Sequence, residues 1–413
     1  MAVLLSPRPA ELAAAHRVGA AAVAVTPAHP APTAREGADR RVRVDWRDHT
    51  ALVRALRELP EVRARRAAVL GLDGPAEALA AARANAALGL PAGAGPGPGT
   101  VSVLADKAAT RALSNTLHPT RPVSFVRCGR ADLLPFLTGL IGTPCVVRPR
   151  CGSRGEGVRL VTGPAQAEAA ARVYPAVTDL IVEEWLPGPE LTVVTLSHAG
   201  RHRILGHTLR RPGPADGPLA LAAGHELTAP LPPETAAAVR ALVEGVLNLA
   251  GHREGAAHLD LVLTPYGPRL IEAHAHPPAE ELCGLLRLGR GVDVPGLVIA
   301  AALGLPAPLA TPRTTAPAGL RYVDLPPGTH APRALRAAVA AARAVPGVVR
   351  VRLPDTDPGR PLTVHHPATG SRRHGWILAT APDRRALRAC LGEAARRLAL
   401  LLAPPPTRRL PCP

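Results

Sequence analysis

The sequence predicts a multi-lobed protein of mixed α/β (α+β) class, and three observations indicate it. The chain has 413 residues, more than the roughly 100 to 200 that one domain usually holds. Residues 1–104 alternate short apolar runs with alanine-rich stretches, as βαβ units do. From about residue 120 onward, strand-like segments follow one another across glycine- and proline-containing turns. We therefore expect an N-terminal βαβ lobe, a central antiparallel lobe and a C-terminal lobe.

The N-terminal lobe is expected at residues 1–104. The apolar and alanine-rich segments that predict its strands and helices are 2–5, 21–25, 51–58, 67–70 and 75–88. The sequence GAGPGPG follows at 93–99. Its glycines resemble those of a dinucleotide-binding turn, but its alternating prolines exclude that turn and favour a linker loop.

The central lobe is expected at residues 105–310, with a nucleotide-binding subdomain at about 118–190. It opens with a helix to about residue 116. Strand-like segments and helices then follow at 123–126, 144–148, 158–161, 164–173, 180–184, 191–196, 233–250, 258–263 and 268–274. The turn at 187–189 is expected to join two of these strands. The C-terminal lobe, 311–413, carries strands at 320–324, 348–353 and 376–379, helices at 332–344 and 384–401, and a frayed proline-rich tail.

The net charge of +17 and the pI near 11.2 raise the question of a polyanion partner. The arginines are scattered as short pairs, which is typical of a solvated surface. The chain also has only two phenylalanines, three tyrosines and three tryptophans, so few side chains could stack on bases. We expect no nucleic-acid partner, and a polyanion-binding protein stays the less favoured alternative.

Three further features indicate a soluble cytoplasmic protein. The six cysteines show no C-x-x-C spacing, which favours reduced thiols. The first residues lack a basic segment followed by an apolar core, so no signal peptide is expected. The longest apolar run, 296–305, is about half of what spans a bilayer, and we expect it to form a buried helix rather than a membrane anchor.

Lys107 is the single lysine of the chain, because every other basic side chain apart from histidine is arginine. A bias against lysine explains the composition. The one exception then indicates a position where a compact ammonium is needed and a planar guanidinium does not serve. Chance survival of one lysine is an equally good account from composition alone.

The sequence CGSRGEG at 151–157 lies between two expected strands. Its three glycines would let the backbone fold closely over a polyanion, with backbone amides and Ser153 as hydrogen-bond donors. No helix follows it, so it is not a Walker loop. A phosphate-covering loop is one reading, and an ordinary hairpin turn is the other.

A hairpin centred on Tyr266 would place Asp260 opposite Glu272. Strand alternation predicts that Glu272 shares a face with Leu270, His274 and His276. Two carboxylates about 5 Å apart repel, so the pairing indicates a divalent cation between them. The alternative is a slipped register with both acids in solvent.

The sequence IVEEWLPGPE at 181–190 joins an apolar strand to a turn with acids on both sides. In nucleotide-binding hinges, backbone groups read the adenine edge and an acid beyond the turn takes the ribose hydroxyls. Taken alone, the segment could also be a charged strand end.

As a set, Asp106-Lys107, the loop at 148–158, EEWLPGPE, and HLDL followed by LIEAH resemble the ATP-grasp superfamily. The likeness extends to the branch of bacterial L-amino-acid ligases and related carboxylate–amine ligases. It implies an ATP-grasp fold with an N-terminal pre-ATP-grasp lobe, ATP and Mg²⁺ as cofactors, and a possible homodimer. The positions that it implies for ATP are Lys107 and Arg148 at the phosphates, Gly152 and Ser153 over them, Glu183, Glu184 and Leu186 at the adenine, and Glu190 at the ribose. The positions that it implies for the metal are Asp260, Glu272 and His274.

The chain departs from the family pattern at several of these positions. Arg148 stands where a second phosphate-binding lysine is usual, and His274 stands where an asparagine usually completes the metal shell. A histidine ligand could shift the metal preference toward Mn²⁺. His276 replaces an arginine that usually binds the reacting groups, and Arg210 is a second candidate for stabilising charge there.

The resemblance implies a ligase that activates a small carboxylic acid, an amino acid as first candidate, as its acyl phosphate. An amine substrate would then attack the acyl phosphate, with ADP and phosphate as co-products. Two alternatives stay open: a degenerate ATP-grasp module that binds nucleotide without turnover, and a carboxylase that uses carboxyphosphate.

Overall fold

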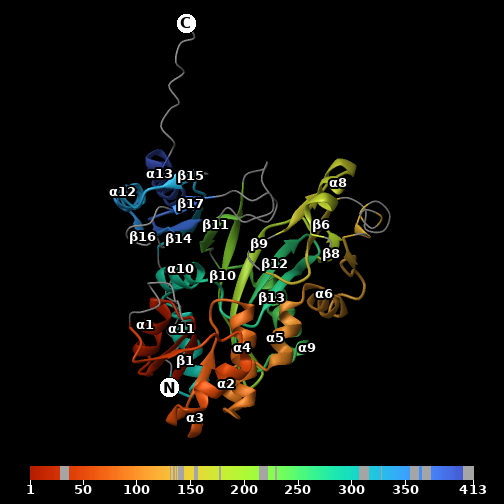
Figure 1. Ribbon diagram of the computed structural model, residues 1–413. Coiled ribbons are helices and arrows are strands. Elements are labelled where there is room, and N and C mark those ends of the chain that lie inside the picture. The colour runs from red at the N-terminus through yellow and green to blue at the C-terminus, as the bar shows by residue number, and fades with distance from the viewer. Residues whose placement is uncertain are drawn as a thin grey trace. The chain divides into compact units, whose positions relative to one another are not determined.

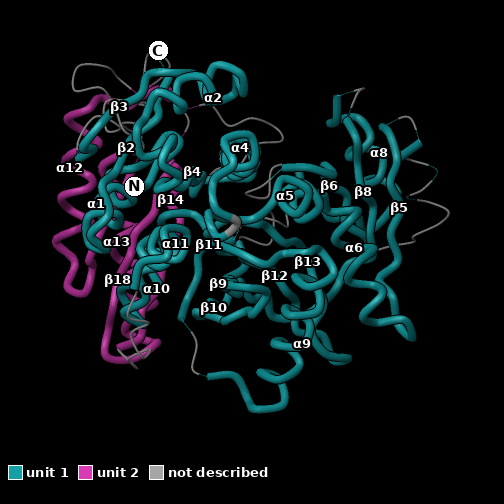
Figure 2. The backbone as a smooth tube through the Cα atoms, turned by 90° about the horizontal axis from the view of Figure 1, so that it is seen from below, with its two compact units in different colours: residues 1–315 teal, residues 316–413 magenta. Residues whose placement is uncertain are grey.

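The computed structural model describes most of the chain. The described residues are 1–27, 37–130, 132, 133, 135, 137, 144–152, 157–175, 178–213, 222–227, 230–306, 316–326, 328–353, 362–364 and 374–402. Contacts divide the chain into two compact units, Met1–Thr315 and Ala316–Pro413 (Figure 2). The finer division at residues 104 and 310 stays a prediction.

The first unit begins with a four-stranded parallel sheet in the order β3-β2-β1-β4 (Figure 1). Its strands are β1 (Ala2–Leu5), β2 (Ala22–Thr26), β3 (Arg40–Arg43) and β4 (Ala68–Leu70). The three apolar strands are fully buried, as parallel strands covered by helices usually are. Its helices are α1 (Pro9–Arg17), α2 (His49–Arg57), α3 (Pro60–Arg63) and α4 (Pro75–Ala87). Strand β3 was not expected, because three of its four residues are arginines on an exposed edge.

A second, antiparallel sheet of four strands has the order β5-β8-β6-β7. Its strands are β5 (Phe125–Gly129), β6 (Cys145–Pro149), β7 (Arg159–Val161) and β8 (Asp179–Glu184), and α8 (Pro164–Val173) packs against it. Two helices precede it, α5 (Pro98–Ala105) and α6 (Lys107–Thr116). Helix α5 therefore begins inside the segment expected as a linker, since Pro98 suits the first helical position.

The centre of the first unit is an antiparallel ladder in the order β13-β12-β9-β10-β11. Its strands are β9 (Glu190–His198), β10 (Arg201–Pro212), β11 (Ala222–Leu227), β12 (Gly255–Thr264) and β13 (Gly267–His274). Helices α5, α6 and α9 (Pro233–Leu249) pack against β13, and α10 (Glu280–Arg290) with α11 (Val294–Ala302) completes the unit. The turn at 187–189 joins β8 to β9, as expected, and it carries the chain from one sheet to another.

The second unit has its own apolar core between three antiparallel strands and two helices. The strands are β14 (Ala318–Val323), β18 (Gly375–Thr380) and β16 (Val348–Arg352), and the helices are α12 (Pro332–Arg343) and α13 (Arg384–Leu402). Two further short strands, β15 (Gly328–His330) and β17 (Leu362–Val364), form an antiparallel pair of their own.

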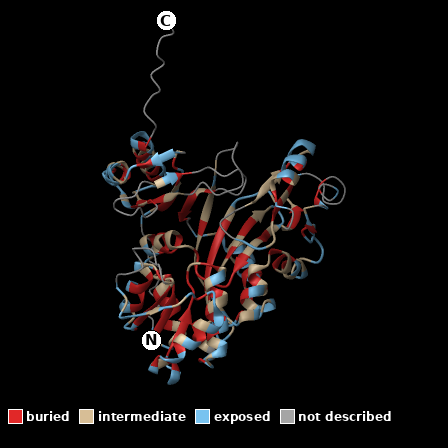
Figure 3. Ribbon diagram, in the orientation of Figure 1, coloured by how far each residue is buried: buried red, intermediate tan, exposed pale blue. Residues whose placement is uncertain are grey.

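Burial follows the layers: the strands of the first unit are mostly buried, whereas its helices expose their outer faces (Figure 3). The predicted buried helix corresponds to α11, six of whose nine residues are buried. Within the part of the chain that the structure describes, no helix is long and apolar enough to cross a membrane.

Candidate active site

The carboxylate pair lies where the hairpin predicts it, with Asp260 of β12 directly opposite Glu272 of β13. The slipped register is therefore excluded. Thr192 of β9 donates its hydroxyl to Asp260 Oδ1 at 2.6 Å. Desolvation raises the pKa of Asp260 to about 6, and the charge of Glu272 adds to the rise. The two acids thus form an electrostatically strained pair.

A β-bulge next to this pair corrects one expectation about the faces of β13. The register passes from Asp260 opposite Glu272 to Leu261 opposite Leu270, so Ile271 is an extra residue. Leu270 therefore packs into the apolar core and does not share a face with Glu272. The carbonyl of Ile271 instead accepts a hydrogen bond from Arg148 Nη2 at 2.7 Å.

Three basic groups approach Glu272. Lys107 Nζ and Arg148 Nη1 each lie 3.7 Å from its Oε2, and His274 Nε2 lies 3.6 Å from Oε1. Burial opposes ionisation of Glu272, but His274, Lys107 and Arg148 together hold its pKa well below the usual range. Glu272 is therefore the member of the pair that keeps its charge to lower pH.

Lys107 is placed by the start of helix α6, which Asp106 caps by accepting the backbone N–H groups of Ala108 and Ala109. Its ammonium is buried and donates to Gly152 O at 2.7 Å. Burial lowers the pKa of Lys107, against the attraction of Glu272. The lone lysine thus joins the glycine-rich loop to the carboxylate pair. Gly152 is exposed, and Ser153 lies outside the described residues.

Arg148 belongs to a buried ion-pair network that includes a residue not expected from the sequence, Arg111. Arg148 Nη2 lies 2.5 Å from Glu183 Oε1, and Arg111 donates through Nε and Nη2 to Glu183 Oε2 at 2.9 Å. Arg111, Arg148 and Glu183 are each at most 5% exposed. Both carboxylate oxygens of Glu183 therefore contact arginine side chains.

The remaining hinge residues lie at the passage from β8 to β9. Glu184 accepts the backbone N–H of Ser124 at 2.9 Å, and Leu186 is half-buried. Glu190 begins β9 and accepts Arg210 Nη1 of β10 at 2.6 Å. The charge of Arg210 also acts to lower the pKa of Asp260. Arg210 and Glu190 are therefore brought beside the carboxylate pair, on the neighbouring strands.

Three histidine rings pack together beyond the carboxylates. His258 stacks on His274 with centroids 4.8 Å apart, and His276 meets His258 edge-on at 5.0 Å. Loss of solvent and the neighbouring His274 lower the pKa of His258 to about 3. His274 Nδ1 is buried without a hydrogen-bond partner, while His276 Nδ1 lies 2.7 Å from Pro277 O. His258 was not singled out from the sequence, although its place two residues before Asp260 puts it on the same strand face.

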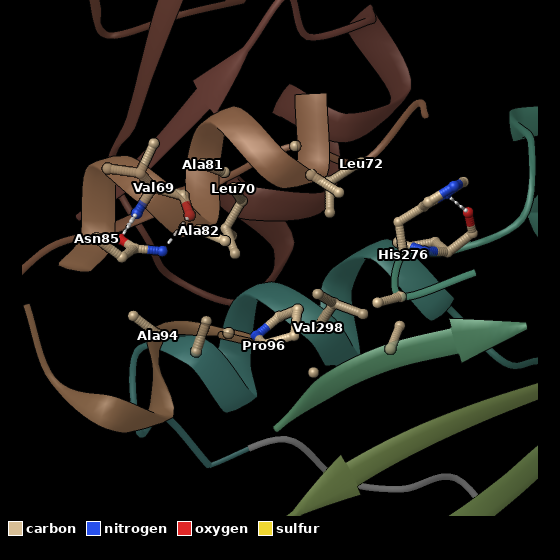
Figure 4. Close-up of a pocket in the computed structure, with 18 residues that line it drawn as sticks. Val69, Leu70, Leu72, Ala81, Ala82, Asn85, Ala94, Pro96, His276 and Val298 are labelled. Atoms are coloured by element: carbon tan, nitrogen blue, oxygen red, sulfur yellow. Dashed lines mark hydrogen bonds between the residues drawn. The ribbon is translucent and has the colours of Figure 1, made fainter. Parts of the chain in front are cut away.

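His276 also lines a small apolar pocket that is partly open to solvent (Figure 4). The other lining groups are mostly alanines, leucines and backbone from β4, α4, the turn at Ala92–Ala94 and α11. Asn85, at the opposite end from His276, is already hydrogen-bonded to the backbone of Val69 (Figure 4). The pocket therefore offers an apolar surface and little free polarity.

The donor set around Asp260 and Glu272 fits a hard cation only with outside help. Within the described residues, no group of three or more His, Cys, Asp or Glu side chains is arranged to hold a metal ion. Mg²⁺ commonly takes one or two carboxylates and completes its shell with water and substrate phosphates. Two opposed carboxylates beside a buried ammonium and guanidinium match that arrangement. The metal role of Asp260, Glu272 and His274 stays a prediction.

Comparisons of the sequence and of the structure with known proteins identify the fold. No protein-family model matches the sequence. Carnosine synthase 1 of Gallus gallus is 29% identical over 183 residues, which is 41% of this chain and 20% of that protein. The chain therefore corresponds to about a fifth of that relative.

Solved structures match along nearly the whole chain. The L-amino acid ligase from Bacillus licheniformis has a TM-score of 0.76 at 22% identity, covering 96% of this chain and 97% of that one. The carboxyaminoimidazole ribonucleotide synthase of Aspergillus clavatus, solved with ATP, has a TM-score of 0.73 at 13% identity, with coverage of 96% and 98%. The biotin carboxylase domain of Hydrogenobacter thermophilus 2-oxoglutarate carboxylase, a dimer solved with MgADP and bicarbonate, has a TM-score of 0.68 at 17% identity, with coverage of 95% and 89%. The chain has the ATP-grasp fold, as its motifs imply.

Proposed function

We propose that this chain is an ATP-dependent ligase that joins a small carboxylic acid, an amino acid as first candidate, to an amine. The reaction would pass through an acyl phosphate and release ADP and phosphate. The observation that carries the proposal is the convergence of Lys107 and Arg148 on Glu272, which itself faces Asp260. The L-amino acid ligase, by its name, acts on amino acids, which supports this choice of substrate class.

The charges of the buried network suit a polyanion. Three cations, Lys107, Arg111 and Arg148, share two carboxylates, Glu183 and Glu272. These cations lie away from water, where electrostatic attraction is stronger than at an exposed site. A triphosphate would be attracted to it.

Glu272 would exchange partners when nucleotide and metal arrive together. In the structure its charge is balanced by Lys107, Arg148 and His274. Asp260 and Glu272 would hold a divalent ion, which would supply positive charge for Glu272 and for the nucleotide phosphates. Lys107 and Arg148 are then released to hold the phosphates. Leu186 through its backbone, and Glu190 through its carboxylate, would take the adenine and the ribose.

The chain's own residues would then assist both chemical steps. The substrate carboxylate attacks the γ-phosphate, and the amine attacks the resulting acyl phosphate and expels phosphate. Lys107 and Arg148 stabilise the charge that develops on the transferred group. Arg210 and His276 are our candidates for additional positive charge at the reacting centre. His276 would contribute it only when protonated.

The decisive experiment is a screen for phosphate release over paired carboxylates and amines, with Mg²⁺ and with Mn²⁺. Glu272→Gln serves as the inactive control. We expect release that depends on both a carboxylic acid and an amine, with a ligated product detectable by mass spectrometry. Release that depends on bicarbonate in place of the acid would assign a carboxylase instead.

One observation favours a second candidate, a module that binds nucleotide without turnover. His274 turns Nε2 toward Glu272 and leaves Nδ1 without a partner, at the position where the resemblance implies an amide oxygen in the metal shell. Measurable ATP binding with no phosphate release for any substrate pair would support this candidate.

A further inference from the structure

We infer that Arg111 and Glu183 form a buried clamp that positions Arg148 for the nucleotide phosphates, so that Glu183 does not read adenine. The inference rests on the proposed ATP site. It changes the role of one hinge residue and adds Arg111 as a positioning residue.

Both carboxylate oxygens of Glu183 are already engaged. Oε2 accepts Nε and Nη2 of Arg111, each at 2.9 Å, and Oε1 lies 2.5 Å from Arg148 Nη2. The residue is 5% exposed. An acid that reads the adenine amino group must present an accessible oxygen to it. Glu183 presents its oxygens to two guanidinium groups instead.

The clamp fixes Arg148 from two sheets at once. Glu183 on β8 holds one edge of the guanidinium, and the carbonyl of the bulged residue Ile271 accepts the same Nη2 at 2.7 Å. Nη1 is thereby turned toward Glu272 Oε2, at 3.7 Å. Because a guanidinium is rigid and planar, holding one edge sets the direction of the other. The free edge faces the carboxylate that we assign to the metal.

Helix α6 couples the clamp to the lone lysine. Arg111 follows Lys107 by one helical turn, so both side chains leave the same face of the helix. Lys107 reaches Glu272 and Gly152 O, while Arg111 reaches Glu183. The helix therefore sets the position of Arg111, and through Glu183 that of Arg148, relative to Lys107.

Buried donors without partners argue against a purely structural pair. Both guanidinium groups contact Glu183, yet Arg111 Nη1 and Arg148 Nε are buried with no hydrogen-bond partner. Buried donors are rarely left without an acceptor unless a ligand or a special function accounts for them. A phosphate beside Arg148 would supply an acceptor for its buried donor.

The test separates phosphate recognition from adenine recognition. Calorimetry of Glu183→Gln and Arg111→Lys would measure affinity for adenosine, for ADP and for ATP with Mg²⁺, and competition would give the ATP over GTP preference. We expect ADP and ATP affinity to fall at least tenfold, while adenosine affinity and base preference stay within twofold. If Glu183→Gln weakens adenosine as much as ATP, or alters the ATP over GTP preference, Glu183 reads the base and the inference is wrong.

A double-mutant cycle tests whether Arg111 acts through Arg148. Arg148→Lys shortens the group that the clamp holds, so the loss of ATP affinity from Arg111→Lys should shrink to less than threefold in that background. Equal losses in both backgrounds would contradict the clamp. Thermal unfolding would show whether the Glu183→Gln protein folds. If it does not, Arg111→Lys, which keeps the positive charge, still tests the clamp. Failure of the wild-type chain to bind ATP would overturn the proposed function instead, and is seen before any variant is made.

Discussion

Replacing Glu272 by glutamine should have opposite effects on nucleotide binding and on turnover. In the structure Lys107 Nζ and Arg148 Nη1 each lie 3.7 Å from Glu272 Oε2. At that distance and an effective dielectric constant of about 20, each attraction amounts to about 4 kcal/mol. Phosphate must displace these contacts when no metal is present to take Glu272. Recovering about 1.4 kcal/mol of this energy would tighten metal-free ADP binding about tenfold.

We therefore expect Glu272→Gln to bind ADP in EDTA about tenfold more tightly than the wild type, measured by calorimetry, while phosphate release with Mg²⁺ falls at least a hundredfold. Asp260→Asn is the matched control. Asp260 contacts Thr192 and lies in the field of Arg210, so its removal takes away a proposed metal ligand without releasing the cations that hold Glu272. It should lose turnover and gain no metal-free affinity. A Glu272→Gln protein that loses ADP affinity in EDTA would refute the exchange of partners.

Three stability measurements follow from groups outside the site. His252 is buried with Nδ1 lacking a hydrogen-bond partner, and burial lowers its pKa to about 4. Below about pH 6.5 the unfolded chain therefore binds a proton at His252 that the folded chain does not bind, and the wild type loses unfolding free energy as the pH falls. In His252→Gln this loss between pH 6.5 and 4 should be smaller by up to about 3 kcal/mol. Unfolding free energies from urea titrations that fall equally with pH in the two proteins would contradict this. Burial raises the pKa of Glu11 to about 7, so the folded chain keeps a proton that the unfolded chain loses above about pH 4.5. Glu11→Gln should therefore stabilise the protein increasingly from pH 4.5 to 8, by up to about 3 kcal/mol. A difference in unfolding free energy that does not change with pH would contradict this prediction. At Gly188, φ is +148° and a Cβ would lie 2.2 Å from Leu263 O. Gly188→Ala should therefore lower the unfolding free energy by about 1 to 3 kcal/mol or more. The control is Gly99→Ala, in α5 with open space around it, which should be neutral or stabilising by up to about 1 kcal/mol.

The hairpin of β12 and β13, which carries Asp260 and Glu272, shows what could and could not be predicted from the sequence. A short turn at Tyr266 fixes the register of the two strands, and this was enough to place Asp260 opposite Glu272. The bulge at Ile271 was not predictable, because an extra residue changes the face of Leu270 without leaving a signal in the alternation of apolar residues. Its consequence is large: the bulge frees the carbonyl that holds Arg148.

Long-range partners were the main omission. Arg111 looks from the sequence like one more basic residue on a helix, and its partner Glu183 is 72 positions away. No spacing rule joins α6 to β8. One signal was present, since Arg111 lies one helical turn after the lone lysine and must share its face. The turn at 187–189 joins two strands as expected, but the sequence carries no signal that β8 and β9 lie in different sheets.

The contrast between Lys107 and Arg148 explains why a chain that replaces lysine elsewhere keeps one. The ammonium of Lys107 is buried between Gly152 O and Glu272 Oε2, two acceptors that a single compact group can serve. A guanidinium there would bring five donors and a planar bulk into the space where the described residues show two acceptors for the ammonium. Arg148 has the opposite surroundings, because Glu183, Ile271 O and Glu272 offer acceptors along the guanidinium edges. The acceptors supplied by each site therefore account for which cation it holds, and the clamp of Arg111 and Glu183 is the feature that lets an arginine take a position where the resemblance implies lysine.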